Sequence, residues 1–403
     1  MPSFYDYNPE QAYLLAPRVG DVWGANHLCF FGSGVVQRLE RSEFERGYSE
    51  TGPPAYHPWL MLKVWLYAYA LGVTSARRLE QRIREDLGFR YLAGSATPDF
   101  WAWNEFRKRH GRAINQVFTQ VVETARAAGM GRWGHVAIDS TRVAANAAAD
   151  STETMPRGRA ERAKIRRAVR RWQQQGDADD PNEAAGTEWG AEPMQRFQER
   201  LAEIPRRRER LQKAGVQRLS KTDEQSRFLR QRRGLVWGYT ATVAVSADHR
   251  IVAQQVNQET TDHGLLLPLV QSVERACGEG PQRVLADSGF FTIANVRPRE
   301  AVGIDAYVPD PNSARELHGR GRGGFHGRAR DPVHRRWRAK LRSAGGRAVY
   351  GRRKAIVEPV FGVLKPQRGM RQFPRRGLAR VAVEFRLAAI AYNLTRLWKQ
   401  RAA

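Results

Sequence analysis

The chain has 403 residues, of which 41% are hydrophobic, so it is long enough for two domains or for one domain with a large insertion. It carries 67 basic and 41 acidic residues, and the net charge of +26 predicts attraction to polyanions, of which nucleic acid is the usual one. Two cysteines are too few for a zinc knuckle or a disulfide framework, which indicates a reducing, cytosolic setting.

Nothing in the sequence indicates a membrane protein. The first residues lack the basic start and the apolar core of a signal peptide. The most apolar window, Trp59 to Val73, covers about fifteen residues and contains Lys63, whereas a spanning helix needs roughly 20 apolar residues. We therefore expect a soluble protein with no membrane partner.

The first 130 residues have the pattern of a helical bundle. His57 to Val73 follows Pro53 and Pro54, carries Pro58 at its second position and is apolar around most of its circumference, which predicts a central helix. Ser75 to Gly94 predicts an amphipathic helix, and its basic side is either a solvated surface or a surface for the DNA backbone. Two further helices are expected over Thr97 to Gly111 and Ile114 to Gly129. We assign residues 1–130 to an all-helical N-terminal domain.

His135 to Asn146 predicts a short strand that ends its apolar run with a carboxylate. Val136 and Ile138 face one way, and Asp139 faces the other from a fixed point on a rigid element. An isolated acidic residue is more often a helix cap or half of an ion pair than a catalyst. The hypothesis of a functional site therefore depends on two further acidic residues, Asp287 and Glu358.

The composition changes abruptly after this strand. Asp150 to Arg233 is rich in Arg, Glu and Gln and poor in large apolar residues, with a loop-like stretch from Gly176 to Gly186. We predict a charged helical insertion between two strands of one sheet, and we interpret its charge as solvated surface.

From residue 237 onward, strands and helices are expected in a mixed order. The sequence predicts a hairpin over Trp237 to Gln258 and a helix over Thr261 to Gly278. A strand from Arg283 that ends at Asp287, a short helix over Phe291 to Arg299 and a short strand over Asp305 to Asp310 follow. This order predicts an α/β fold in which Asp139 and Asp287 can meet on neighbouring strands. Pro311 to Gly346 is studded with Gly and Arg, and we expect a flexible basic loop there.

Glu358 lies in a helical pattern from Tyr350 to Lys365. On one continuous helix, Glu358 and Lys365 would lie about 20° apart, two turns from each other. Pro359 disfavours helical geometry at Glu358, so the helix either kinks there or begins there. The plain alternative is a surface ion pair between Lys354 and Glu358.

Three ordered motifs resemble those of one known family. AIDST at Ala137, LADSGF at Leu285 and the run Y-x2-R-x4-E-x6-K from Tyr350 to Lys365 resemble the three acidic motifs of the DDE transposases of bacterial insertion sequences. Four residues separate the Arg from the Glu, where three are commonest in the family. The segments from Tyr56 to Glu80 and from Phe89 to Phe100 are similar to the helical N-terminal domain of the same group.

The resemblance implies an α/β fold of the ribonuclease H-like kind, a mixed sheet flanked by helices and preceded by an all-helical N-terminal domain. Residues 1–130 would then bind DNA ends, and residues 131–400 would form the catalytic domain and carry the helical insertion at 150–233. The implied location is the cytoplasm of a bacterium, at the nucleoid.

The resemblance also implies the chemistry. Asp139 would bridge two Mg²⁺ or Mn²⁺ ions, and Asp287 and Glu358 would each hold one, an all-oxygen set that suits hard cations. Three further residues would contact DNA phosphates near the cut: Tyr350, Arg353 and Lys365. The partners would be double-stranded DNA, at the terminal inverted repeats and at the target, and a second copy of the chain in a homodimer.

The implied function is transposition of an insertion sequence through binding of its terminal inverted repeats, metal-dependent strand cleavage and strand transfer. Two alternatives from other classes are open. One is a metal-dependent nuclease or resolvase on the same fold, against which the N-terminal helical region argues. The other is a non-catalytic DNA-binding descendant, which has no need of the three acidic residues.

Overall fold

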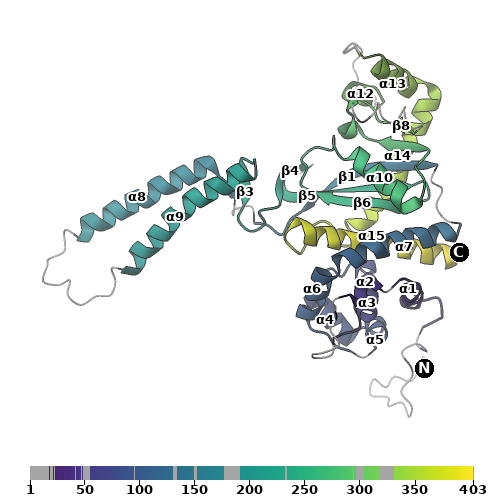
Figure 1. Cartoon of the computed structure of the whole chain (residues 1–403), viewed down its shortest axis with the longest axis horizontal. Coiled ribbons are helices and arrows are strands. Elements are labelled where there is room, and N and C mark those ends of the chain that lie inside the picture. The colour runs from purple at the N-terminus through teal and green to yellow at the C-terminus, as the bar shows by residue number, and fades with distance from the viewer. Residues whose placement is uncertain are drawn as a thin grey trace, which may run out of the picture.

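The structure is a computed structural model in which an arm of two helices extends from a body of helices and one sheet (Figure 1). It describes residues 18, 21, 23–40, 42–46, 48, 55–94, 96–129, 134–148, 152–176, 191–231, 234–293, 295, 304–317 and 331–402. Within these ranges, no helix combines the length and the apolar character that crossing a bilayer requires.

The expected N-terminal helices are present. They are α1 (Leu28–Gln37), α2 (Ser42–Glu45), α3 (Pro58–Ala70), α4 (Ala76–Glu85), α5 (Leu87–Ala93), α6 (Phe100–Arg109) and α7 (Gly111–Ala127). As predicted, α3 is central: it begins at Pro58 behind the capping ring of His57, and ten of its residues are buried. One expected helix is divided in two, because Asp86 accepts hydrogen bonds from the backbone amides of Gly88 and Phe89 and so caps α5 where α4 ends.

The sheet is mixed, as the order of elements predicted. Its strands run in the order β4 (Arg227–Gln231), β5 (Gly234–Ser246), β1 (His135–Ala144), β7 (Arg283–Ala286) and β8 (Asp305–Tyr307), and β6 (Ile251–Asn257) also pairs with β5. Strand β5 is antiparallel to β1, β4 and β6. Strand β7 is parallel to β1, and β8 is parallel to β7. The chain therefore folds as a mixed α/β protein.

Helices cover the sheet and join it to the N-terminal helices. The elements are α10 (Leu266–Cys277), α14 (Ala344–Leu364) and α15 (Leu378–Ala402). Helix α15 packs against β6 and also against α3 and α7, so the hydrophobic core runs without a break from the N-terminal helices to the sheet. Helix α7 also packs against α10. The division of the chain at residue 130 stays a prediction.

The insertion after β1 is a hairpin of two long helices. Its elements are β2 (Thr152–Thr154), α8 (Met155–Gly176), α9 (Ala191–Lys213) and β3 (Arg218–Ser220). β2 and β3 pair at its base, and the two helices extend away from the sheet (Figure 1). Most of the loop expected from Gly176 to Gly186 lies outside the described residues.

The loop predicted from Pro311 to Gly346 is wrong where the structure describes it. Two helices form there, α12 (Pro311–Leu317) and α13 (Pro332–Arg342). Asp310 caps the first through the backbone amide of Asn312 and pairs with Arg338 of the second, at 2.9 Å. The indole of Trp337 is buried and donates to the backbone oxygen of Val308. The abundance of Gly and Arg in this segment led us to predict a loop, because the stabilising contacts of Asp310 and Trp337 cannot be seen in the sequence pattern. Residues 318–330 lie outside the described part.

The prediction of a helix over Phe291 to Arg299 concerns mostly residues outside the described ranges. A short 3-10 helix, η4 (Ser288–Phe290), comes directly before it.

A buried ion pair links the N-terminal helices to α15. Arg107 of α6 donates to Glu384 of α15 at 3.2 Å, and their side chains are 2% and 0% exposed. The Arg107 guanidinium also donates to the hydroxyl of Tyr69 and lies 4.0 Å from the ring centroid of Trp65. Burial raises the pKa of Glu384 to about 7, against the lowering effect of Arg107.

We expect Arg107→Met to lower the free energy of unfolding by about 3–5 kcal/mol, because it removes the cation that contacts the buried Glu384 carboxylate and leaves only the charge of Arg375 near it. The double variant R107M/E384M should lose less than the single variant, because it removes both charges. Urea-induced unfolding of the full chain measures both. Arg84→Met is the control, since its pair with Glu80 is exposed and contributes about 1 kcal/mol or less. Equal losses for Arg107→Met and Arg84→Met would contradict the prediction.

Candidate functional site

The sheet brings two of the three predicted carboxylates to one edge. Asp139 lies on β1, and Asp287 follows β7 directly. The parallel register pairs Ile138 with Ala286, so Asp139 and Asp287 occupy the next position on each strand. Asp287 accepts a hydrogen bond from the backbone amide of Gly289 at 2.9 Å and caps η4. Asp139 accepts a hydrogen bond from the backbone amide of Ser140 at 2.9 Å, so both carboxylates are held by the backbone around them.

One positive charge at this edge comes from α14. Arg353 donates to the Oδ2 of Asp139 at 3.0 Å, and the two side chains are 9% and 19% exposed. Burial raises the pKa of Asp139 to about 6; the Arg353 guanidinium opposes this rise and the Asp287 carboxylate adds to it. Burial also raises the pKa of Asp287, and Arg353 again acts in the lowering direction.

Two residues at this edge escaped the sequence prediction. Arg142, three residues after Asp139 on β1, donates to both carboxylate oxygens of Asp262, at 3.1 and 3.3 Å. Asp262 in turn raises the pKa of Asp287, and Arg142 lowers it. The helix predicted over Thr261 to Gly278 begins later than expected, since α10 starts at Leu266, and the carboxylate of Asp262 is engaged by Arg142.

Gly289 allows the two acidic loops to approach each other. A Cβ atom at this position would lie 3.0 Å from the Oδ1 of Asp287 and 3.2 Å from the Oδ2 of Asp262. Both contacts are tighter than ordinary van der Waals contacts, so any larger side chain would push a carboxylate aside. The glycine in the LADSGF motif therefore has a structural reason.

The structure does not bring Glu358 to this pair. Helix α14 runs without interruption through Pro359, so the helix does not begin at Glu358. Glu358 is exposed, and it forms no ion pair with Lys354, the plain alternative for this position. Among the described residues, no three acidic, His or Cys side chains are arranged to hold a metal ion.

The three residues predicted to contact phosphates lie on or beside α14. Tyr350 is 6% exposed, and burial raises its pKa. Arg353 is engaged by Asp139. The amine of Lys365, directly after α14, lies 3.4 Å from the backbone oxygen of Arg142 on β1. By helical geometry Glu358 lies on the same side of the helix axis as Lys365, one position beyond α14, and its side chain is exposed. Contact of all three with DNA stays a prediction.

The donor chemistry of the edge fits a hard cation only in part. Carboxylate oxygens are the ligands that Mg²⁺ and Mn²⁺ prefer, and Asp139 and Asp287 supply them side by side. The third ligand, Glu358, is not beside them, and the Arg353 guanidinium occupies one oxygen of Asp139. Two of the predicted ligands thus fit, and the complete set is not assembled.

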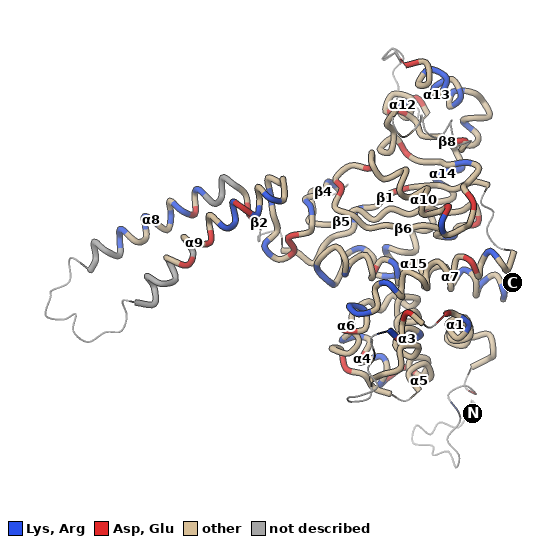
Figure 2. The backbone as a smooth tube through the Cα atoms, in the orientation of Figure 1, with Lys and Arg blue, Asp and Glu red and all other residues tan. Residues whose placement is uncertain are grey.

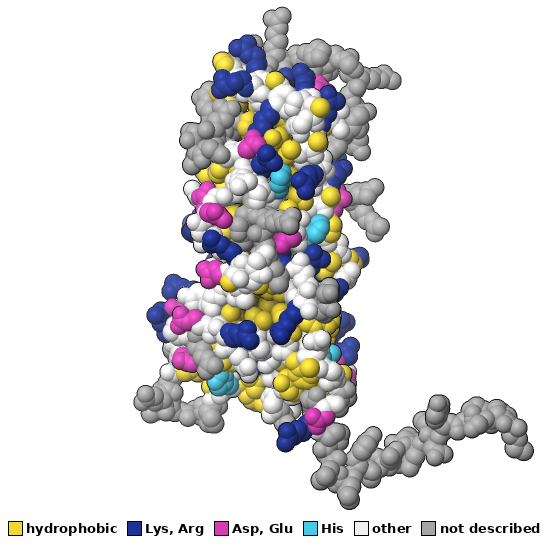
Figure 3. Space-filling model, turned by 90° about the vertical axis from the view of Figure 1, so that its right-hand side faces the viewer, with side chains coloured by type: hydrophobic (Ala, Val, Ile, Leu, Met, Phe, Trp, Pro, Cys, Tyr) yellow, Lys and Arg dark blue, Asp and Glu magenta, His cyan; other side chains and the backbone are white. Residues whose placement is uncertain are grey.

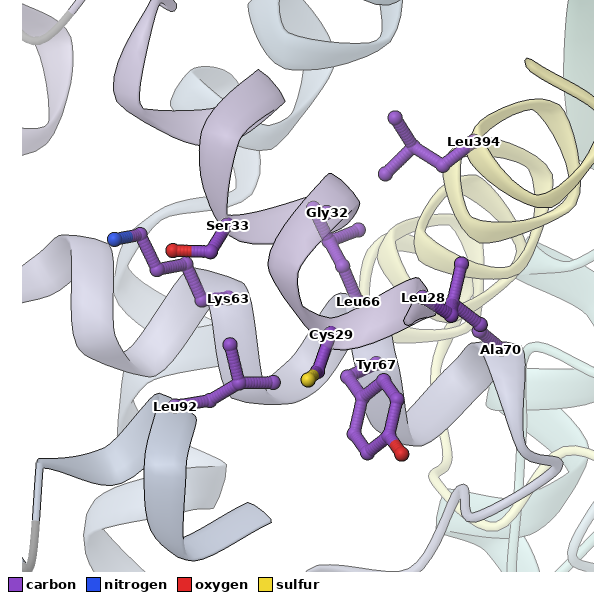
Figure 4. A pocket seen from close by; sticks show the side chains of 10 residues that line it. All are labelled: Leu28, Cys29, Gly32, Ser33, Lys63, Leu66, Tyr67, Ala70, Leu92 and Leu394. Carbon is purple, nitrogen blue, oxygen red and sulfur yellow. The ribbon is translucent and has the colours of Figure 1, made fainter. Parts of the chain in front are cut away.

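Two cavities lie away from these carboxylates. One, of about 20 Å³, is lined by Cys29, Ser33, Lys63 and mainly apolar residues of α1, α3, α5 and α15, and it has room for about one water (Figure 4). The other, of about 460 Å³, is lined by residues of α1, α7 and α15, among them Phe30 and Trp398. Neither is lined by an acidic residue, so neither continues the carboxylate edge.

Basic side chains are widely spread over the surface. On the face drawn in Figure 3, they occur from the N-terminal helices at the bottom to the α13 region at the top, and apolar side chains gather mainly over the lower half. This distribution agrees with the net charge of +26 and with an anionic partner.

Comparison with known families finds two matches. Residues 26–109 match a family described as a transposase domain (DUF772), and residues 325–398 match a family described as a transposase DDE domain. The first covers α1 to α6, and the second covers all of α13 and α14 and most of α15. No curated protein and no solved structure was found to match the chain.

We expect Arg353→Met to raise the pKa of Asp139 above about 6 and to raise that of Asp287 as well, because one guanidinium lowers both. NMR titration of the carboxyl carbons in protein labelled at aspartate measures the two values. Arg283→Met is the matched control, because Arg283 pairs with Asp305 at the opposite end of β7. Unchanged titration of both aspartates in Arg353→Met would contradict the assignment.

Proposed function

The chain belongs to the DDE transposases of insertion sequences, and we propose that it moves its element by binding the terminal inverted repeats, cutting DNA at each end and joining the freed end to target DNA. The observation that carries this proposal is the meeting of Asp139 and Asp287 at one edge of the sheet, although 148 residues separate them (287 minus 139). Two backbone-held carboxylates are an arrangement that phosphodiester chemistry can use.

Asp139, Asp287 and Glu358 would hold two divalent cations, Mg²⁺ or Mn²⁺. When bound, the ions neutralise charge on the attacking and leaving oxygens of an in-line displacement. The support for Asp139 and Asp287 is their position on adjacent strands and their oxygen donors. The support for Glu358 is its place on the same side of the helix axis as Lys365, whose amine lies beside β1.

The basic residues of this edge would bind and orient the DNA. Arg353 neutralises Asp139 in the free protein, and its fork can bind a phosphate bidentately when DNA is present. Lys365 lies beside the end of β1 and would contact a phosphate as a point charge. Tyr350 lies one turn before Arg353 on the same helix and would support it.

The fold of the sheet region is proposed to be ribonuclease H-like. In space the strands run β6, β5, β1, β7, β8, with the first three antiparallel and the last two parallel to β1. The strand that carries Asp139 is thus central, and the two carboxylates lie where β7 ends beside the middle of the parallel strand β1. Residues 131–400 would be the catalytic domain, with the insertion at 150–233, and residues 1–130 would bind the DNA ends.

The partners would be double-stranded DNA at the terminal repeats and at the target, and a second copy of the chain. The net charge of +26 supports the first. The second follows from the reaction, since two ends must be cut together. The proposed location is the bacterial cytoplasm, at the nucleoid.

A metal-dependent nuclease on the same fold is the nearest alternative, followed by a non-catalytic DNA binder. Purified protein with Mg²⁺ and a labelled terminal repeat separates them. Cleavage with joined product supports the transposase, cleavage alone supports the nuclease, and a mobility shift without cleavage supports the binder.

We expect Asp139→Asn and Asp287→Asn each to lower the rate of strand cleavage by more than about 100-fold, because even partners of metal ligands cost about 10–100-fold when removed. Glu358→Gln should cause a loss of the same order. The measurement is single-turnover cleavage of the terminal repeat in Mg²⁺ and in Mn²⁺.

The controls keep the same chemical change at exposed positions away from the edge. They are Asp21→Asn before α1 and Glu123→Gln on α7, and neither should change the rate more than twofold or so. Normal cleavage by Asp287→Asn would contradict the assignment of Asp139 and Asp287 as the catalytic pair. Normal cleavage by Glu358→Gln alone would remove only the third ligand.

A further inference from the structure

Helix α8 of the insertion presents a row of arginines to solvent. Four of them recur at spacings of three and four residues, within about 80° of one another around the helix. All four are exposed, and we call them the α8 basic face: Arg159, Arg162, Arg166 and Arg170. Figure 2 shows Lys and Arg along the described length of α8.

The opposite side of α8 holds the two helices together. Ile165 on α8 and Leu211 on α9 are 5% and 4% exposed. Arg207 of α9 binds three carboxylates, Glu153 of β2 at 3.0 Å, Glu161 of α8 at 3.3 Å and Glu203 of α9 at 2.5 Å. The acidic residues near the base of the arm are thus used to join its elements.

The α8 basic face itself carries no such compensation. Within the described part of the chain, none of its four guanidinium groups pairs with an acidic side chain. Between residues 159 and 171, α8 has seven basic residues and one acidic residue, Glu161, which is engaged by Arg207. Four charges of one sign on a projecting helix repel one another unless an anion covers them.

We propose that the α8 basic face binds the phosphate backbone of double-stranded DNA, independently of sequence. Arg forks match phosphate oxygens. From Arg159 to Arg170 the α8 basic face spans about 17 Å along the helix axis, about half of one turn of duplex, which is about 34–36 Å. A second copy of this chain is a poor occupant, because it carries the same net charge of +26.

The point at which the arm joins the sheet determines which part of a bound DNA the arm can contact. The arm leaves the sheet after β1, which carries Asp139, and returns to it at β4. DNA held at the carboxylate edge therefore has the arm beside one of its flanks. The inference rests on the proposed function only for this choice of DNA. Binding to the arm requires no catalysis.

The test compares wild type with the variant R159Q/R162Q/R166Q/R170Q. Fluorescence anisotropy measures the affinity for a duplex that contains the terminal repeat with flanking DNA, over a series of salt concentrations and without divalent cations. Each phosphate contact contributes about 0.9 to the slope of log K against log salt, so we expect the slope to fall in magnitude by about 3–4 and the affinity by at least about tenfold. A scrambled duplex should show the same change.

The control removes the same charge from dispersed, exposed positions on β7, α10 and α15, outside the N-terminal helices: Arg283, Arg275, Lys399 and Arg401, each changed to Gln. Its slope should change by less than about 1. Circular dichroism establishes that α8 and α9 remain helical in the variant. Arg207→Met is a second variant, which should loosen the arm and weaken binding while leaving the α8 basic face intact.

Several outcomes would overturn the proposal: an unchanged slope in a folded variant, an equal change in the control, a loss confined to the terminal-repeat sequence, or a loss of self-association without loss of DNA affinity. Failure of the proposed function is seen separately. A wild-type protein that binds DNA through α8 but never cleaves it would refute the transposase reaction and leave this surface assigned.

Discussion

Two carboxylates held side by side in a partly buried position need positive charge near them, and the rest of the edge is built around this requirement. The parallel pairing of β1 and β7 fixes Asp139 and Asp287 as neighbours. Burial and mutual repulsion both act against ionisation of Asp139. Arg353 of α14 and Arg142 of β1 supply the compensation, the first to Asp139 and the second through Asp262. The position of α14 on the sheet is therefore tied to the acidic pair.

This compensation also accounts for the position of Glu358. Arg353 and Glu358 are five residues apart, so on one helix their side chains leave the axis about 140° from each other. A continuous α14 that directs Arg353 into Asp139 cannot direct Glu358 to the same point. Arg353 and a divalent cation would compete for the same oxygen of Asp139. Assembly of all three carboxylates thus requires Arg353 to release Asp139 and α14 to turn or shift, and a phosphate is an anion that can receive the released guanidinium.

The sequence predicted the parts of this arrangement that follow from local pattern. The apolar run before Asp139, the strand that ends at Asp287 and the helical spacing around Glu358 were all visible, and they led to the mixed sheet and to two adjacent carboxylates. The sequence could not predict Asp262, because its role depends on the register that places Arg142 beside it. It also missed α12 and α13, whose stability comes from the buried Asp310 and Trp337 and not from helical periodicity. A helix boundary set by one side chain, as at Asp86, is equally hard to read in advance.

The long helix α15 explains how distant parts of the chain can act on one DNA molecule. It packs on β6 and on α3 and α7, and Glu384 ties it to Arg107 inside the N-terminal helices. A buried ion pair of this kind is weak evidence for stability but strongly favours one arrangement, since any separation leaves a charge in the core. The N-terminal helices and the sheet therefore keep a fixed geometry. The α8–α9 arm, in contrast, extends away from the sheet (Figure 1) and contacts it at its base, where the indole of Trp237 on β5 donates to the hydroxyl of Thr152 on β2. The rigid body would fix the position of the cut and so provide specificity. The arm would contact the DNA phosphate backbone and so add affinity, because phosphate contacts hold DNA of any sequence.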